Sequence, residues 1–264
     1  MIKSILLKSL PLVTFVALLG GCDSGSGGKK IPLGEFYKIE ASNFEKKVGT
    51  GCDSTAGLCL QVDFKGVEIK APKEDTVAQI IQDSIQSQFL RSPFGGERLA
   101  SLDVLNQEME KANLQFEEDF PEIQQEWYVN RDVEVSHENG EYISFRFDES
   151  SFLGGAHPNT FRIYTTYSKE DGSRMVLTEL LSDEELSKIK VAAEAELRKQ
   201  TKIAADSSFA EAGFWFPDDQ FVLNDNFVLK EDGILFHFNA YEIAPYVYGE
   251  FELWIPNEKF RPAA

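Results

Sequence analysis

The residues best suited to chemistry in this sequence centre on His157, within the glycine-rich segment 154–159. Gly154 and Gly155 permit positive φ and a close approach of the backbone, and Pro158 pushes the residue before it toward an extended conformation. We therefore expect this loop to hold the imidazole in one orientation. An imidazole fixed in this way can act as a general base, contact a ligand, or hydrogen-bond to the backbone.

A catalytic use of His157 would pair it with a nucleophile at Ser150 or Ser151, with Glu242 orienting the ring. Neither serine stands in a G-x-S-x-G elbow. The sequence holds three histidines: His137, His157 and His237. Their spacing does not match that of zinc ligands, so we predict no metal site and no cofactor. We assign no catalytic residue, favour a loop histidine over a base, and keep an envelope deacetylase or hydrolase using His157 and nearby acidic residues as the alternative.

A second segment, Ala240 to Gly249, combines three tyrosines with a carboxylate and a proline at the exit of a predicted strand. Tyrosines beside glycine and proline are typical both of edge packing and of recognition surfaces, and both interpretations stay open. Glu242 is interpreted first as an acceptor for N–H groups of its own loop, and Asn159 as a turn residue. The candidate binding or loop-architecture residues are therefore His157, Asn159, Tyr241, Glu242 and Tyr246.

Two acidic and amide-rich turns raise the question of calcium. They are Asp218-Asp219 and the segment Asn224-Asp225-Asn226. Neither follows the pattern of an EF-hand loop, so we interpret both as solvated turns.

The N-terminal segment has the form of an export signal. Lys3 and Lys8 precede an apolar run that is too short to span a bilayer, and small residues stand immediately before Cys22. An ordinary cleaved signal with an incidental cysteine is the alternative. The similarity to bacterial lipoproteins implies a signal peptide over 1–21, a lipid-bearing Cys22, and a flexible tether over 22–34. The expected location is the cell envelope, on a bacterial membrane, facing the periplasm or the exterior.

The two other cysteines, Cys52 and Cys59, flank a short segment that contains a glycine. In an oxidising compartment, two cysteines this close most simply form a disulfide that pins a hairpin-like loop. A redox-active pair is the alternative, but the spacing is not C-x-x-C.

The charge of the chain limits its partners. It carries 44 acidic and 26 basic side chains, and removal of Lys3 and Lys8 with residues 1–21 takes the formal charge from −18 to −20. Such a body repels nucleic acid, so we predict no nucleic-acid partner, and it attracts basic proteins over a range set by salt. The 21 phenylalanines argue against disorder.

Periodicity indicates alternating groups of strands and helices. In the first half it predicts strands around Gly66 with a turn or bulge there, a helix with Val77, Ile80, Ile81 and Ile85 on one face, a helix with the stripe Leu102, Leu105, Met109, Ala112 and Phe116, and a hairpin at Asn139-Gly140. In the second half it predicts a helix with a capping box at Ser182 and Glu185, followed by strands at 221–229, 233–239 and 249–255. We expect an α+β fold of antiparallel sheets packed with helices, in two closely associated subdomains.

The sequence resembles the RsiV-like family. The resemblance is carried by residues 154–159, the helix entry at 177–181, and the stretch from Ile234 to Pro256. It implies a PdaC-like N-terminal domain over 35–165, an RsiV-like C-terminal domain over 166–258, and a tail over 259–264. One member type of that family binds lysozyme, and another joins the N-terminal domain to a carbohydrate deacetylase. We therefore expect a lipid-anchored, non-enzymatic protein that recognises a lysozyme-like basic protein or peptidoglycan.

Overall fold

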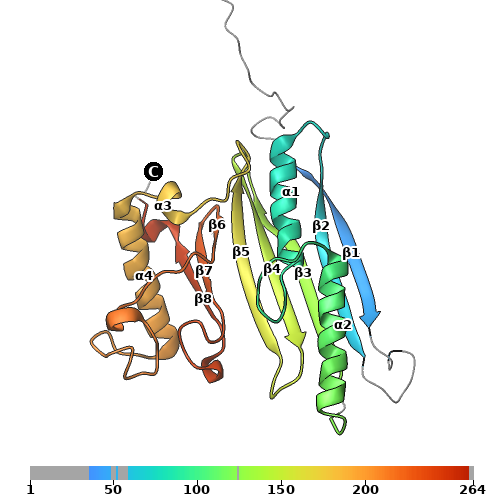
Figure 1. Cartoon of the computed structure of the whole chain (residues 1–264). Coiled ribbons are helices and arrows are strands. Elements are labelled where there is room, and N and C mark those ends of the chain that lie inside the picture. Colours follow the sequence, from blue (N-terminus) through green and yellow to red (C-terminus); the bar gives the residue numbers. More distant parts are fainter. Residues whose placement is uncertain (1–35, 49–51, 53–58, 124, 262–264) are drawn as a thin grey trace, which may run out of the picture.

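The computed structural model describes residues 36–48, 52, 59–123 and 125–261. The predicted signal peptide, the tether with Cys22, and the end of the predicted tail lie outside these residues. Among the described helices, none combines the length and apolar character needed to cross a membrane. The chain forms an α+β structure of two subdomains that lie side by side (Figure 1).

The larger subdomain is built on a five-stranded sheet. Its strands are β1 (Lys38–Val48), β2 (Leu60–Lys70), β3 (Trp127–Glu138), β4 (Tyr142–Phe152) and β5 (Asn159–Ser168). They follow one another across the sheet in chain order. All neighbours are antiparallel except β2 and β3, which pair in parallel. This pair departs from the expected antiparallel sheet, because the chain between β2 and β3 leaves the sheet and returns through two helices.

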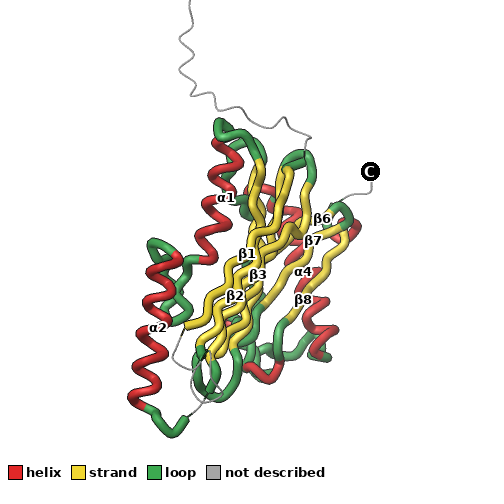
Figure 2. Tube along the Cα trace, turned by 90° about the vertical axis from the view of Figure 1, so that its right-hand side faces the viewer, coloured by secondary structure: helices red, strands yellow, loops and turns green. Residues whose placement is uncertain are grey.

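Those helices, α1 (Thr76–Phe89) and α2 (Leu102–Asp119), cover one face of the larger sheet (Figure 2). The predicted stripe of α2 packs against the apolar side chains of β2 and β3. On α1 the prediction is wrong at one position: Ile80 is 46% exposed, and Ala78 is buried in its place. The face of α1 that packs on the sheet therefore consists of positions 77, 78, 81 and 85, and Ile80 lies outside this face.

Gly66 stands in the middle of a continuous strand, without the predicted turn or bulge. The register between β1 and β2 runs through Ser42 and Gly66 without a shift. A Cβ at this position would lie 2.8 Å from Cζ of Phe89. The glycine therefore serves the close packing of α1 on β2.

Two local predictions about the hairpins hold with a change of detail. Cys52 and Cys59 form the predicted disulfide between the ends of β1 and β2. The hairpin of β3 and β4 forms as expected, but its turn is closed by the side chain of Asn139, which accepts hydrogen bonds from the N–H groups of Glu141 and Tyr142. Gly140 is not among the described glycines with positive φ.

The smaller subdomain packs helices against a three-stranded antiparallel sheet. Its elements are α3 (Leu177–Leu180), α4 (Asp183–Thr201), β6 (Phe227–Lys230), β7 (Gly233–Phe238) and β8 (Phe251–Pro256). Short 3-10 helices cover Pro217–Asp219, Tyr246–Tyr248 and Asn257–Lys259. The capping box of Ser182 and Glu185 forms as predicted. β6 is shorter than predicted, because the residues before it, among them the buried Phe221, pack into the core as irregular chain.

Two asparagines join the subdomains at the edge of β5. Asn226 accepts a hydrogen bond from the N–H of Tyr164 (2.7 Å) and donates one to the carbonyl of Arg162 (2.7 Å). Asn239 bonds to both backbone groups of Arg162. The turn that contains Asn226 is therefore a structural contact, and its interpretation as a solvated turn is wrong. The edge of β5 is satisfied by side chains of the second subdomain, which holds the two units together.

Candidate functional site

Two loops from different subdomains bring His157, Tyr241 and Tyr246 together. The first loop connects β4 and β5, and the second connects β7 and β8. The imidazole of His157 stacks on the ring of Tyr246, with centroids 4.2 Å apart and planes at 16°. The ring of Tyr241 lies 6.3 Å from the imidazole and 5.3 Å from the ring of Tyr246. Tyr241 and Tyr246 are 51% and 39% exposed, so the cluster faces solvent.

The backbone of both loops explains this position. Gly154 and Gly155 have φ of 87° and 104°, a region that favours glycine. A Cβ at Gly154 would also lie 3.3 Å from the ring of Phe116. In the second loop Tyr241 itself has φ of 66°. A non-glycine residue in this region carries strain, which the surrounding hydrogen bonds must offset.

Those hydrogen bonds centre on Glu242. Its carboxylate accepts from the N–H of Asn239 (2.8 Å) and from the side-chain amide of Asn224 (2.6 Å). The carboxylate thus closes the turn that presents Tyr241. Asn159 lies exposed at the first position of β5, where it pairs with Ser151.

Each ring nitrogen of His157 has one contact within hydrogen-bond range. Nδ1 lies 2.8 Å from the carbonyl oxygen of Pro158, which can only accept, so Nδ1 carries a proton. Nε2 lies 3.4 Å from the hydroxyl of Tyr241, which can donate to it.

The alternative catalytic grouping of His157, a serine and Glu242 is not brought together by these loops. Among the described residues no contact joins Glu242 to His157, since the carboxylate is engaged by Asn224 and Asn239. Ser151 is buried at 5% exposure, and Ser150 lines a neighbouring cleft. Within the described part of the chain there is no group of three or more His, Cys, Asp or Glu side chains that could hold a metal ion.

The neighbouring cleft, of about 450 Å³, lies on the sheet face opposite the helices and reaches the second subdomain at Glu250. Its polar lining is mixed in charge and includes Asp63, Lys65, Asn130, Asp132, Asp148, Ser150, Thr160, Arg162 and Glu250. Arg162 pairs with Asp148 (2.6 Å) and with Glu252 (3.0 Å). Thr160, which stands three residues after His157, donates a hydrogen bond to Glu250 (3.2 Å). The charged cleft therefore reaches the subdomain junction at Glu250 and at Thr160, which lies on the strand that follows the loop of His157.

His237 lies at the same junction, and its surroundings could not be predicted from the sequence. Its side chain is fully buried, with Nε2 3.7 Å from Glu250 and Nδ1 3.6 Å from Glu252. Its ring packs edge-on against Tyr164 of β5, 6.3 Å between centroids. Burial lowers the pKa of His237, and the two carboxylates oppose that shift. The sequence offers only an imidazole in an apolar run as a signal.

Comparisons with known proteins match two separate stretches of the chain, one in each subdomain. Residues 59–160 match the family model for Deacetylase PdaC, and residues 178–258 match the model for Protein of unknown function (DUF3298). The peptidoglycan-N-acetylmuramic acid deacetylase PdaC of Bacillus subtilis (strain 168) is 26% identical over 164 residues, which is 60% of this chain. The chain covers 34% of that protein's length, about a third.

Two solved structures share the fold. A member of the DUF3298 family from Bacteroides fragilis NCTC 9343 aligns with a TM-score of 0.62 at 19% identity, covering 86% of this chain and 93% of the other. A DUF3298 family protein from Pseudomonas aeruginosa PAO1 aligns with a TM-score of 0.57 at 19% identity, covering 84% and 92%. These structures confirm the α+β fold. The family model over residues 59–160 confirms the PdaC-like resemblance of the N-terminal part.

Proposed function

Because the chain joins a PdaC domain to a DUF3298 domain, we propose that it is a lipid-anchored binding protein of the cell envelope. In this proposal it is non-enzymatic and recognises a basic, lysozyme-like protein through the surface formed by His157, Tyr241 and Tyr246. Cys22 carries the lipid and holds the protein on the membrane.

The stacked rings carry the proposal. Exposed tyrosines held by rigid loops are typical of recognition surfaces, because they offer large contact area at a low cost in conformational entropy. The stack of His157 on Tyr246 crosses the subdomain junction, so a partner that binds it contacts both units. The charged cleft at the subdomain junction adds carboxylates, and the formal charge of −20 that remains after removal of residues 1–21 accelerates encounter with a basic partner.

Peptidoglycan is the second candidate ligand, and the sequence match favours it. The Bacillus subtilis relative is named for deacetylation of a peptidoglycan sugar. This chain covers about a third of that relative. The match therefore does not support assigning the relative's deacetylase activity to this chain. An envelope location follows from either ligand.

Binding of the full chain, purified in detergent, to a c-type lysozyme tests the proposal directly. We expect Tyr246→Ala to weaken binding by about 30-fold, the loss expected at an aromatic hot spot. Phe36→Ala is the matched control, since Phe36 is 66% exposed and its ring lies 5.2 Å from Nζ of Lys169, beyond the far end of β5. Affinity should fall between 50 and 300 mM salt.

Two results would contradict this proposal. Absence of measurable binding to both lysozyme and purified peptidoglycan overturns the proposal. Release of acetate from acetylated peptidoglycan by the wild-type chain, lost in a folded His157→Ala variant, supports the enzyme alternative instead.

A further inference from the structure

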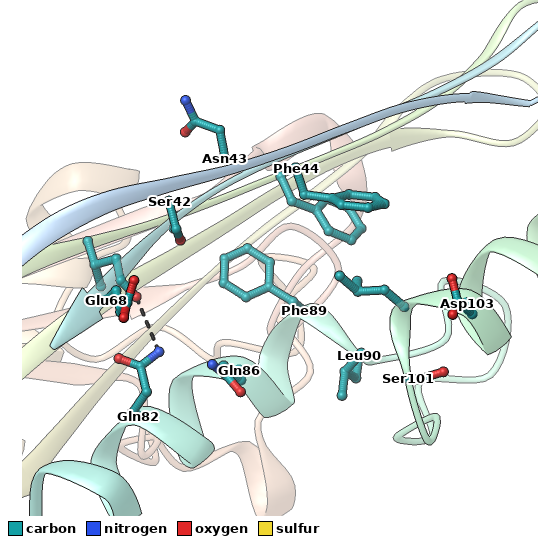
Figure 3. A pocket seen from close by; sticks show the side chains of 14 residues that line it. Ser42, Asn43, Phe44, Glu68, Gln82, Gln86, Phe89, Leu90, Ser101 and Asp103 are labelled. Carbon is teal, nitrogen blue, oxygen red and sulfur yellow. Dashed lines mark hydrogen bonds between the residues drawn. The ribbon is translucent and has the colours of Figure 1, made fainter. Parts of the chain in front are cut away.

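The larger subdomain has an open groove of about 650 Å³ on its helical side. None of the residues of the aromatic cluster lines it. It lies between β1 and β2, the last turns of α1 and the first turn of α2 (Figure 3). Its volume falls in the range of small-ligand sites, which is about 300 to 1,000 Å³.

The floor of the groove is aromatic. Phe44, Phe64 and Phe89 follow one another with ring centroids 5.9 and 5.7 Å apart. Phe44 and Phe89 are half-buried, so part of each ring faces the groove, whereas Phe64 is buried beneath them. Gly66 leaves the space that lets Phe89 lie directly against β2.

The walls carry polar groups of two kinds. Gln82 is fixed, because its amide accepts from the N–H of Ile69 (2.8 Å) and donates to the carbonyl of Val67 (3.3 Å), the dashed line in Figure 3. The side chains of Ser42 and Gln86, by contrast, make no hydrogen bond to any other residue that the structure describes. Their donors and acceptors are available to a ligand.

The charge of the lining selects against anions. Glu68 and Asp103 are the charged residues among those that line the groove, and no Lys, Arg or His belongs to the lining. Glu68 is paired with Lys70 (2.5 Å), which lies outside the lining, so a phosphate, a nucleotide or an acidic peptide would meet the carboxylate of Asp103 and no cation among the lining residues. The lining therefore suits a neutral ligand that presents hydroxyl and amide groups.

We infer that this groove binds one or two rings of a neutral, N-acetylated glycan. The C–H face of a sugar ring packs on Phe44 and Phe89, its hydroxyls donate to Glu68 and Asp103, and its acetamido group bonds to Gln86. This inference deepens the peptidoglycan arm of the proposed function and rests on it. A peptide strand added to β1 fits less well, because that edge carries the charged side chains Lys38, Glu40, Glu45, Lys46 and Lys47.

Titration of the full chain with chitotetraose, an uncharged N-acetylated tetrasaccharide, tests the inference. We expect Gln86→Ala to weaken binding by about fivefold, the cost of one lost hydrogen bond. Ser42→Trp, which fills the groove from β1, should abolish binding. Gln79→Ala is the matched control, since Gln79 is exposed on the same helix and does not line the groove. A heparin tetrasaccharide should not bind.

Each other outcome overturns the inference in a distinct way. Chitotetraose binding that is insensitive to Gln86→Ala but lost in Tyr246→Ala places the glycan on the aromatic cluster and leaves the proposed function standing. Protection of the β1 amides by a peptide, with no response to the sugar, shows a strand-adding partner. No binding of chitotetraose or of purified peptidoglycan removes both the groove and the peptidoglycan arm.

Discussion

The side-chain amide of Asn239 forms hydrogen bonds with both the N–H and the carbonyl of Arg162. The N–H of Arg162 donates to Oδ1 of Asn239 at 2.6 Å, and Nδ2 of Asn239 donates to the carbonyl of Arg162 at 3.0 Å. The amide thus occupies the place of a neighbouring strand on the free edge of β5. It also positions the second loop, because the N–H of Asn239 donates to Glu242 beside Tyr241.

Asn239→Ala should therefore destabilise the protein by about 1 to 3 kcal/mol, the cost of leaving partly buried polar groups unpaired. The measurement is urea unfolding followed by circular dichroism. Asn159→Ala serves as the control, since Asn159 is exposed and an exposed substitution changes stability by about 0.5 kcal/mol or less. Equal midpoints for the two variants would show that the amide is not a structural link.

The ion pair of Arg131 and Glu149 lies inside the larger subdomain. Nε and Oε2 are 2.6 Å apart, and the side chains are 0% and 4% exposed. The guanidinium also donates to the carbonyls of Phe89 and Arg91, so it ties the end of α1 to the sheet. Arg131→Met should cost about 3 to 5 kcal/mol, because it leaves a buried carboxylate without its partner.

The double variant Arg131→Met with Glu149→Leu should recover part of that loss, since no charge is then left buried. Chemical denaturation of the single and double variants measures the difference. Lys188→Ala, which removes an exposed pair with Glu184, should change stability by about 0.5 kcal/mol or less. A double variant as unstable as the sum of its parts would assign the cost to lost packing and not to charge.

Features that depend on residues close together in the sequence could be predicted. The capping box at Ser182 and the disulfide of Cys52 and Cys59 depend on residues within one turn or one loop, and both form as expected. The contacts of the junction depend on residues far apart in sequence: Tyr164 and Asn226 are separated by 62 positions, and His157 and Tyr241 by 84. Only the fold brings these pairs together, so no periodicity could indicate them.

Reduction of the Cys52–Cys59 bond should lower the stability of the larger subdomain. The bond spans a sequence separation of 7, and the entropy of closing so short a loop corresponds to roughly 2 to 3 kcal/mol. Thermal unfolding with and without reductant measures the effect. The double variant Cys52→Ser with Cys59→Ser should match the reduced protein and show no response to reductant. A response in that variant would contradict the assignment.

The buried imidazole of His237 makes stability depend on pH. Charged and polar groups face it from two sides: Glu250 and Glu252 around β8, and Arg162 with Tyr164 on β5. Burial is the largest effect and lowers its pKa, Arg162 lowers it further, and the two carboxylates oppose the change. The folded protein therefore takes up the proton at lower pH than the unfolded chain, whose histidine titrates near about 6.5.

Because the unfolded chain binds the proton first, the stabilising contribution of neutral His237 is complete above pH of about 6.5. It is lost as the pH falls from there toward the lowered pKa of the folded state. His237→Phe keeps an aromatic ring against Tyr164 and removes the titration, so its stability should be flatter between pH 7 and 5. Urea midpoints at half-unit intervals give both curves, and His137→Phe controls for loss of a histidine elsewhere. Parallel curves for wild type and His237→Phe would show that carboxylates alone set the acid sensitivity.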